Sequence, residues 1–286
     1  MNKLNWKLLT ALSIILISFT ACDDDDYYVT GNNWISYGNL EKVEGSARSE
    51  FIIHRDDNSR LIAVDGINLN NLKAEDGTRV CYTYSILDSK RQPQGLEGNI
   101  DYYIYLSQIE DVLTKSPINE SFINENPEHR QDSIGNDPIN VREAWFGGKY
   151  LNVEFNLPVK GDSKISHMIN LVREDVTLHQ DTVYLTLRHN AYGDRPSTAG
   201  VRSRGENFFW VWGNVSFDLT DILPEGKTSV PVKLIWEAYK GNTQTTETLT
   251  DCGLFTMQPQ KSKAAAGGLN AEPKNLKNER STAICR

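Results

Sequence analysis

The chain has 286 residues, with 38 aspartate and glutamate residues against 30 lysine and arginine residues and a formal net charge of −8 at pH 7. This acidic balance, without a stripe of basic residues, argues against nucleic-acid binding, which needs clustered Lys and Arg to neutralise phosphates. The length favours two domains, and after residue 21 no apolar run is long enough to span a bilayer.

The chain begins with a pattern that predicts a secretion signal. Lys3 and Lys7 precede the apolar run of residues 8–21, and Cys22 follows directly. A short basic start, an apolar run and small residues before a cysteine are typical of a signal peptide over residues 1–21, cut before Cys22. The alternative is a transmembrane helix, but this run spans only about 21 Å, less than the hydrocarbon core of about 30 Å.

Residues 20–22 (Thr-Ala-Cys) resemble the lipobox of bacterial lipoproteins, with Phe19 where an aliphatic residue is commoner. This resemblance implies that Cys22 carries lipid and anchors the chain to a membrane of the cell envelope. We therefore expect an outer-membrane lipoprotein. Its exposure at the cell surface or in the periplasm stays open.

Four aspartates open the predicted tether, residues 22–33: Asp23, Asp24, Asp25 and Asp26. They have two interpretations. One is a solvated acidic spacer, since like charges repel and keep a segment extended. The other is an address, because the stretch resembles the acidic surface-export signal of lipoproteins in Bacteroidetes.

Three further cysteines, Cys81, Cys252 and Cys285, have spacings that match no zinc pattern. Cys81 lies in an alternating strand pattern and is most simply a small core residue. Cys252 and Cys285 could pair in an oxidising compartment, but we expect that they do not.

Residues 34–115 predict an all-β domain. Apolar runs at 51–54 and 60–64 flank a turn at 56–59, and residues 79–87 alternate as in a strand. Residues 102–106 form another expected strand. Leu106, Ile109, Val112 and Leu113 recur at helical spacing, which predicts one short helix before Pro117. Short strands with one helix favour an OB-like barrel.

Residues 116–138 are polar, contain three prolines and are interpreted as a linker between domains. Residues 139–256 then contain about six segments with one apolar face each, a pattern typical of a β-sandwich. Residues 257–286 have almost no periodic apolar pattern and are expected to be disordered. This tail does not resemble the end of a sandwich, so the last strand is expected to be truncated if the tail is an appended extension.

Several blocks of the chain together resemble the NigD-like lipoproteins of Bacteroidetes. Their order and spacing, rather than any single motif, carry the resemblance over roughly residues 28–240. The blocks are residues 75–80, 102–115, 135–141, 149–155, 167–172, 184–190, 215–223 and 233–236, with Trp145. The resemblance implies an N-terminal OB-like domain, a C-terminal β-sandwich and a supposed role in bacteriocin immunity. It implies no catalytic residue, because the family's molecular activity is not established.

No motif for catalysis, metal or cofactor binding is found. The five histidines form no HExxH pair, and Asp56-Asp57-Asn58-Ser59 lacks the glycine and the glutamate that a calcium loop needs. There is no GxSxG elbow. The acidic pairs Glu174-Asp175 and Asp218/Asp221 are ordinary surface residues near strand ends, unless a cleft brings two carboxylates together for hydrolysis.

Two concentrations of aromatic residues are the candidate binding surfaces. Tyr103 and Tyr105 are expected on the face of their strand opposite Tyr102, Ile104 and Leu106. In an OB-like barrel such a face can stack on sugar rings, but packing is the commoner reason for such residues. The second concentration is residues 208–212, which are apolar on both faces. Either Phe209 and Val211 are exposed, or Phe208, Trp210 and Trp212 are, unless another segment covers them.

These observations predict a lipid-anchored, non-enzymatic envelope protein with a binding or protective role, in the immunity version directed against a toxin. The alternative is a glycan-binding surface module, and a second alternative is a hydrolase that uses the acidic pairs. A protein or glycan partner is expected in the first two cases, and no cofactor in any of them.

Overall fold

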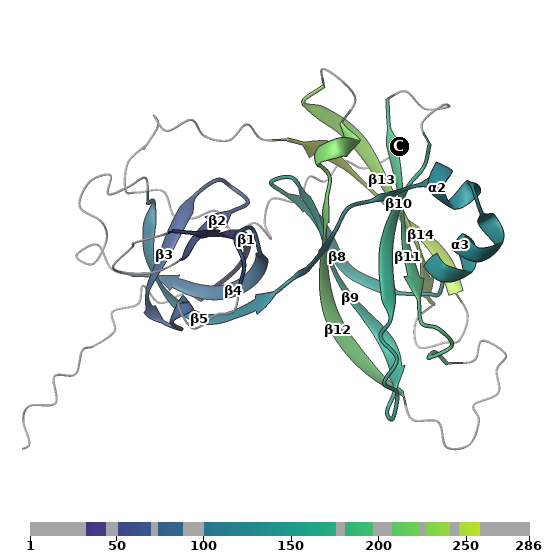
Figure 1. Ribbon diagram of the computed structural model, residues 1–286, viewed down its shortest axis with the longest axis horizontal. Coiled ribbons are helices and arrows are strands. Elements are labelled where there is room, and N and C mark those ends of the chain that lie inside the picture. The colour runs from purple at the N-terminus through teal and green to yellow at the C-terminus, as the bar shows by residue number, and fades with distance from the viewer. Residues whose placement is uncertain are drawn as a thin grey trace, which may run out of the picture.

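The computed structural model describes residues 33–43, 51–69, 74–87, 100–175, 181–196, 208–223, 227–240 and 246–257. They form a small closed barrel beside a larger β-sandwich (Figure 1). The prediction of an all-β chain with an N-terminal OB-like barrel and a C-terminal sandwich is confirmed. The predicted signal peptide, Cys22, Asp23–Asp26, Cys285 and the tail after residue 257 lie outside the described residues. Among the residues described, no helix is long and apolar enough to cross a membrane.

Five strands close the barrel in the order β1-β2-β3-β5-β4, with β3 and β5 parallel. Each strand contributes alternating apolar residues to the interior, where Leu40, Ile53, Leu61, Ile104 and Leu106 are almost fully buried. The strands are β1 (Trp34–Lys42), β2 (Phe51–Arg55), β3 (Arg60–Gly66), β4 (Arg79–Ile86) and β5 (Tyr102–Asp111).

The short helix predicted from Leu106 to Leu113 is wrong. These residues continue β5 to Asp111 and then begin β6 (Leu113–Lys115). Gln108 to Asp111 pair with β4, so their backbone groups are satisfied by ladder hydrogen bonds that a helix would forfeit. The helical spacing covered only two turns, too few to outweigh a neighbouring strand. A register shift at Thr83 accommodates the long β5.

Two sheets form the sandwich, in the orders β14-β13-β11-β10-β7 and β6-β12-β9-β8. Between them lies a single apolar core that includes Val153, Leu185, Phe217, Leu234 and Phe255. The remaining strands are β7 (Ile118–Asn119), β8 (Asn140–Gly147), β9 (Tyr150–Lys160), β10 (Met168–Arg173), β11 (Val183–Asn190), β12 (Phe208–Asp218), β13 (Ser229–Tyr239) and β14 (Thr246–Thr256).

The segment interpreted as a linker is part of the sandwich. It contains β7 and two short helices, α2 (Glu120–Asn124) and α3 (Pro127–Ile134), which lie at one side of the sandwich in Figure 1. Ile123 and Ile134 pack on Val172 of β10, and Asn190 donates a hydrogen bond to the carbonyl of Asp132 (2.7 Å). The polar composition of residues 116–138 suggests a linker because only a few buried side chains attach this segment to the sandwich.

The closing strand of the sandwich is complete. β14 pairs with β13 from Thr246 to Thr256, and Phe255 is fully buried in the core. The expected truncation of this strand is therefore wrong. Cys81 is buried in the barrel wall and outside any disulfide, as predicted for a core residue. Cys252 is disulfide-bonded.

Arg79 joins the barrel to the sandwich. From β4 its guanidinium donates to both carboxylate oxygens of Asp56 in the β2–β3 turn (2.7 Å each). It also donates to Asn152 of β9 (2.8 Å) and Ser216 of β12 (3.0 Å) in the sandwich. Arg79 and Asp56 are both buried, so the charges are compensated by each other and by these polar groups.

Aromatic packing surrounds this ion pair. The Arg79 guanidinium lies 3.9 Å from the ring centre of Tyr150, and Tyr37 meets Trp145 edge to face at 5.2 Å. Gly147 passes so close to Asp56 that a Cβ there would lie 2.2 Å from the carboxylate. The two lobes are therefore joined by a buried contact that requires these particular side chains.

Candidate binding surface on strand β12

The first half of β12 exposes four consecutive large apolar side chains. Their exposed fractions are 60% for Phe209, 45% for Trp210, 41% for Val211 and 62% for Trp212, and Phe208 is half-buried. The prediction offered one face or the other, and the structure exposes residues of both. We call Phe209–Trp212 the aromatic patch. Side chains of this kind are normally buried, so a contiguous exposed run indicates a contact surface.

The second half of the same strand is buried. Val215 and Phe217 face the core, and Ser216 faces the barrel, where it accepts the hydrogen bond from Arg79. β9 pairs with β12 over its whole length, from Phe208 to Asp218. On the other side β6 pairs only with Val215–Phe217. The aromatic patch is thus the part of β12 that extends past β6.

Neighbouring side chains orient the tryptophans. The guanidinium of Arg142, on β8, lies 5.3 Å from the ring centre of Trp212. Trp210 meets Tyr239, the last residue of β13, edge to face at 5.8 Å. These contacts restrict the rings while much of their surface stays in water, which lowers the entropy cost of binding a partner.

A buried polar cluster supports the patch from behind. The Asp194 carboxylate accepts the backbone N–H of Lys160 (3.0 Å), the β9 residue that pairs with Phe208. Asp194 also contacts the ring of His167 (3.2 Å), and His167 contacts His189 (2.9 Å). His189 in turn reaches the carbonyl of Pro138 (3.1 Å). The cluster fixes the end of β9 against which the patch is built.

Burial and hydrogen bonding shift the pKa values of His189 and Asp194 in this cluster. Burial lowers the pKa of His189 to about 4, so this ring is neutral at pH 7. Burial would raise the pKa of Asp194, but hydrogen bonds from Ser163, Lys160 and His167 hold it below its usual value. The cluster therefore pairs a carboxylate with two histidines, and all three groups are hydrogen-bonded.

The barrel tyrosines do not form a second patch. Tyr103 is buried (4% exposed) among Ile52, Ile62, Leu87 and Ile100, and Tyr105 packs against the same cluster. The two do lie opposite the face of Ile104 and Leu106, as the alternation predicted. Leu87 and Ile100, which flank the β4–β5 connection, cover this outer face, so it offers no stacking platform.

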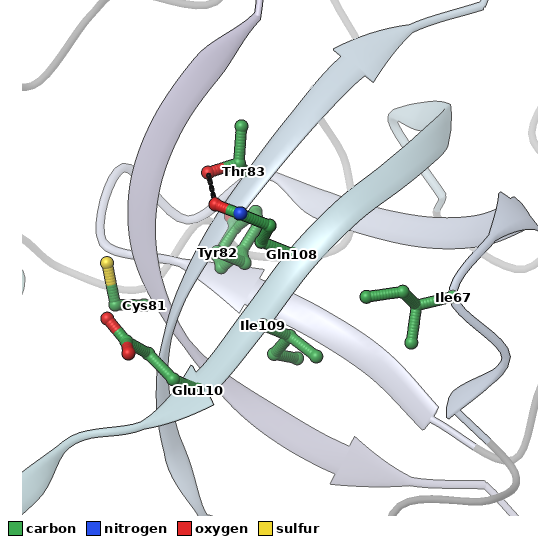
Figure 2. Close-up of a pocket in the computed structure, with 7 residues that line it drawn as sticks. All are labelled: Ile67, Cys81, Tyr82, Thr83, Gln108, Ile109 and Glu110. Atoms are coloured by element: carbon green, nitrogen blue, oxygen red, sulfur yellow. Dashed lines mark hydrogen bonds between the residues drawn. The ribbon is translucent and has the colours of Figure 1, made fainter.

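A hollow of about 360 Å³ lies over the β4–β5 pair (Figure 2). In Figure 2, Ile67 and Ile109 line one side and Cys81 and Glu110 the other, and Thr83 contacts Gln108. One carboxylate among mostly uncharged residues makes no catalytic arrangement, so we assign this hollow no role.

The carboxylates of three other candidates, Asp56, Asp57 and Asp218, have structural partners. Asp56 holds Arg79 and Asp57 pairs with Arg55 (2.8 Å), so the suspected calcium loop binds arginines. Asp218 pairs with Lys149 (2.7 Å), and the Asp175 N–H donates to Glu120 (3.3 Å). Within the described ranges no group of three or more His, Cys, Asp or Glu residues has the geometry to hold a metal ion.

Comparison with protein families matches residues 121–249 to the NigD-like C-terminal beta sandwich domain. This range starts in α2 and ends in β14, so it coincides with the sandwich. The chain resembles the NigD-like proteins, as its sequence predicted. A comparison with curated proteins finds no match.

Solved structures share the fold of both lobes. One is a protein of unknown function from Bacteroides vulgatus, 22% identical, which covers 86% of this chain and 99% of its own, with a TM-score of 0.56. Another is a NigD-like immunity protein from Bacteroides caccae, 18% identical, which covers 78% of this chain and 93% of its own, with a TM-score of 0.53. At these identities the likeness establishes the fold alone.

Proposed function

We propose that this chain is a lipid-anchored envelope protein that acts by binding, not by catalysis, and that its aromatic patch is the contact surface. The exposure of Phe209, Trp210 and Trp212 on a rigid two-lobed body is the observation that supports this proposal most directly. Aromatic residues, tryptophan above all, dominate the binding energy of protein interfaces. His167, His189 and the carboxylates of Asp194 and Asp218 are engaged in contacts within the fold, which favours binding over hydrolysis.

The protective version of this function is bacteriocin immunity. It is supported by the structural likeness to a NigD-like immunity protein. A protein anchored at the envelope would intercept a toxin before the toxin reaches its target. The anchor is proposed on Cys22, and the four aspartates after it are proposed to be a spacer or a surface-export signal.

The anchor has a direct test. Cys22→Ala should move the full-length chain from the detergent phase to the aqueous phase on Triton X-114 partitioning, because the acylated thiol is lost. Cys81→Ala, at a buried barrel cysteine, is the matched control and should stay in the detergent phase. If the Cys22 variant still partitions with detergent, the proposed anchor is wrong.

The binding function is tested by toxin sensitivity. Deletion should sensitise the cell to a bacteriocin produced by a neighbouring strain, and the intact gene should restore resistance. Trp210→Ala/Trp212→Ala should fail to restore it. Leu113→Ala, at a residue of comparable exposure on β6, is the control and should restore it. If deletion leaves sensitivity unchanged across a panel of producing strains, the immunity version is wrong.

Glycan binding is the second candidate. Trp210 and Trp212 lie two residues apart on one face of β12, about 6.6 Å along the strand, a spacing at which two rings can stack on a sugar chain. A glycan array probed with the intact chain and with Trp212→Ala separates the candidates. Binding that depends on Trp212 would favour the glycan module over immunity.

A further inference from the structure

The backbone of the aromatic patch has a strand neighbour on one side only. Within the part of the chain that the structure describes, β9 pairs with Phe208–Asn214 on one side, and β6 begins to pair only at Val215 on the other. Such an edge presents unpaired N–H and C=O groups and accepts an added strand. The open stretch spans the seven residues 208–214.

Other open strand edges in the sandwich have features that discourage pairing. β8 has a bulge between Val141 and Glu143, with Arg142 at the bulge. β10 is open beyond β7, but Lys115 donates to the carbonyl of Ile169 there (2.9 Å). β14 has Glu247 and Asp251 along its length. Residues 208–214 have no charge, no proline and an unbroken register with β9, so this edge lacks the protection that the three other described edges have.

The open stretch is complementary to itself. An antiparallel copy centred on Val211 places Phe209 opposite Gly213 of the second copy, whose side-chain position is covered by the Phe155 ring of its own chain. Trp210 comes opposite Trp212 of the second copy, an aromatic cross-strand pair, and Val211 faces its own counterpart. Pairing cannot pass Val215, where β6 occupies the edge, so the register that uses all seven residues 208–214 is centred on Val211.

We propose that a second copy of this chain adds to the free edge of β12, antiparallel and centred on Val211. The two β6-β12-β9-β8 sheets then become continuous across a two-fold axis that is normal to the sheet. Trp210 and Trp212 share one face of β12, so the pair of copies gathers four tryptophans on a single surface. The binding site becomes composite, with half of its rings supplied by the second copy.

The position of the barrels agrees with this arrangement. Arg79 of the barrel reaches Ser216, which has the same strand parity as Trp210 and Trp212 and so lies on the same face. A two-fold axis normal to the sheet leaves both barrels on that one side. Two N-terminal tethers can therefore reach one membrane.

The expected association is weak in dilute solution. Three half-exposed aromatic side chains of about 150–250 Å² each can bury about 300 Å² per copy, to which Val211 and the backbone add. Stable interfaces bury about 1,200–2,000 Å² in total. Confinement of tethered copies to one membrane raises their effective concentration, which favours the pair.

Cysteine cross-linking in the envelope tests the pairing. Directly opposite residues of an antiparallel pair have Cα atoms about 4.5–5.5 Å apart, within the range of a disulfide. Full-length Val211→Cys, treated with a mild oxidant in intact cells, should therefore run as a dimer on a non-reducing gel. Leu113→Cys, comparably exposed on β6 but off the axis, should stay monomeric, as should the wild type. No dimer for Val211→Cys, or equal dimer for both variants, would overturn the proposal.

A charge swap provides the second measurement. Val211→Lys and Val211→Glu should each abolish pairing, because like charges lie directly opposite across the axis. Two differently tagged chains, one with each substitution, should become cross-linked when they are produced together and the intact cells are treated with a carbodiimide, which joins an amine to a carboxylate. Unchanged thermal melting of each variant shows that the fold is retained. Failure of the mixed pair to cross-link would contradict the proposed register.

That the four-tryptophan surface binds a partner rests on the proposed function, but the pairing itself does not. Cross-linking at position 211 with unchanged toxin sensitivity on deletion would sustain the pair and refute the immunity function. Resistance that depends on Trp210 and Trp212, without cross-linking at position 211, would sustain the function and refute the pair.

Discussion

The two halves of β12 lie in opposite environments, one buried and one exposed. Around Ser216 the strand is enclosed by the barrel, and a buried arginine satisfies its polar side chain. Around Trp212, a few residues away, the strand projects beyond β6 and exposes aromatic rings. The same ladder with β9 supports both halves. The buried junction of the lobes therefore anchors one half of β12, while the other half presents a surface whose own contacts contribute little to stability.

The largest effect is expected at the junction. Arg79→Met should lower the free energy of unfolding by about 3–5 kcal/mol, because it leaves the Asp56 carboxylate buried without a partner. Urea denaturation measures the change. The double variant Arg79→Met/Asp56→Leu should recover part of the loss. If Arg79→Met alone unfolds at the wild-type urea midpoint, the junction does not hold the lobes together.

Two matched variants on β12 test the difference in stability between its buried half and its exposed half. Phe217→Ala should cost about 3–5 kcal/mol, because it opens a cavity in the core of the sandwich. Phe209→Ala, the same change on the same strand, should cost less than about 0.5 kcal/mol because its ring is mostly in water. Thermal unfolding of both variants tests this. Equal losses would mean that the patch is part of the core.

Acid should weaken the support behind the patch. The pKa of His189 is about 4 in the folded chain and 6.5 in the unfolded chain, so between these values the unfolded chain binds more protons. Stability therefore falls as the pH falls from about 6.5 to about 4, by at most about 3 kcal/mol from this residue.

The variant His189→Gln isolates this contribution. Chemical denaturation at a series of pH values should give a shallower dependence for the variant than for the wild type over the same window. Parallel curves would show that His189 titrates at its ordinary value in the folded chain.

The smallest effect is expected at the rim of the patch. Arg142→Ala should change stability by about 0.5 kcal/mol, because its contact with Trp212 is exposed to water. The same variant should quench or shift tryptophan fluorescence as the ring loses its neighbour. A loss of several kcal/mol would place Arg142 in the structural framework instead.

Alternation of apolar residues predicted most of the architecture. It located the barrel, the sandwich and the exposed run at residues 208–212, because each is a local pattern. It could not decide which face of that run is exposed, since the answer depends on which distant segments pack on each face. It failed at residues 106–113, where pairing with β4 outweighs helical spacing, and at residues 116–138, where a few buried side chains attach a polar segment.

Contacts between distant residues explain the remaining differences. Arg79 contacts Asn152 and Ser216, which lie far from it in the sequence, and no sequence motif indicates that the three residues meet. Tyr103 is buried because Leu87 and Ile100 fold over it, which strand alternation cannot reveal. Such pairings arise from the tertiary fold and become visible only in three dimensions.

The chain passes from one lobe to the other across Val112, a single buried residue between β5 and β6. β6 and β7 then occupy an edge of each sheet in turn. A force applied to the chain before the barrel is thus transmitted directly to both sheets of the sandwich. If the N-terminus is held at a membrane while a captured molecule pulls on β12, the force passes between the two strands through the parallel β6–β12 ladder.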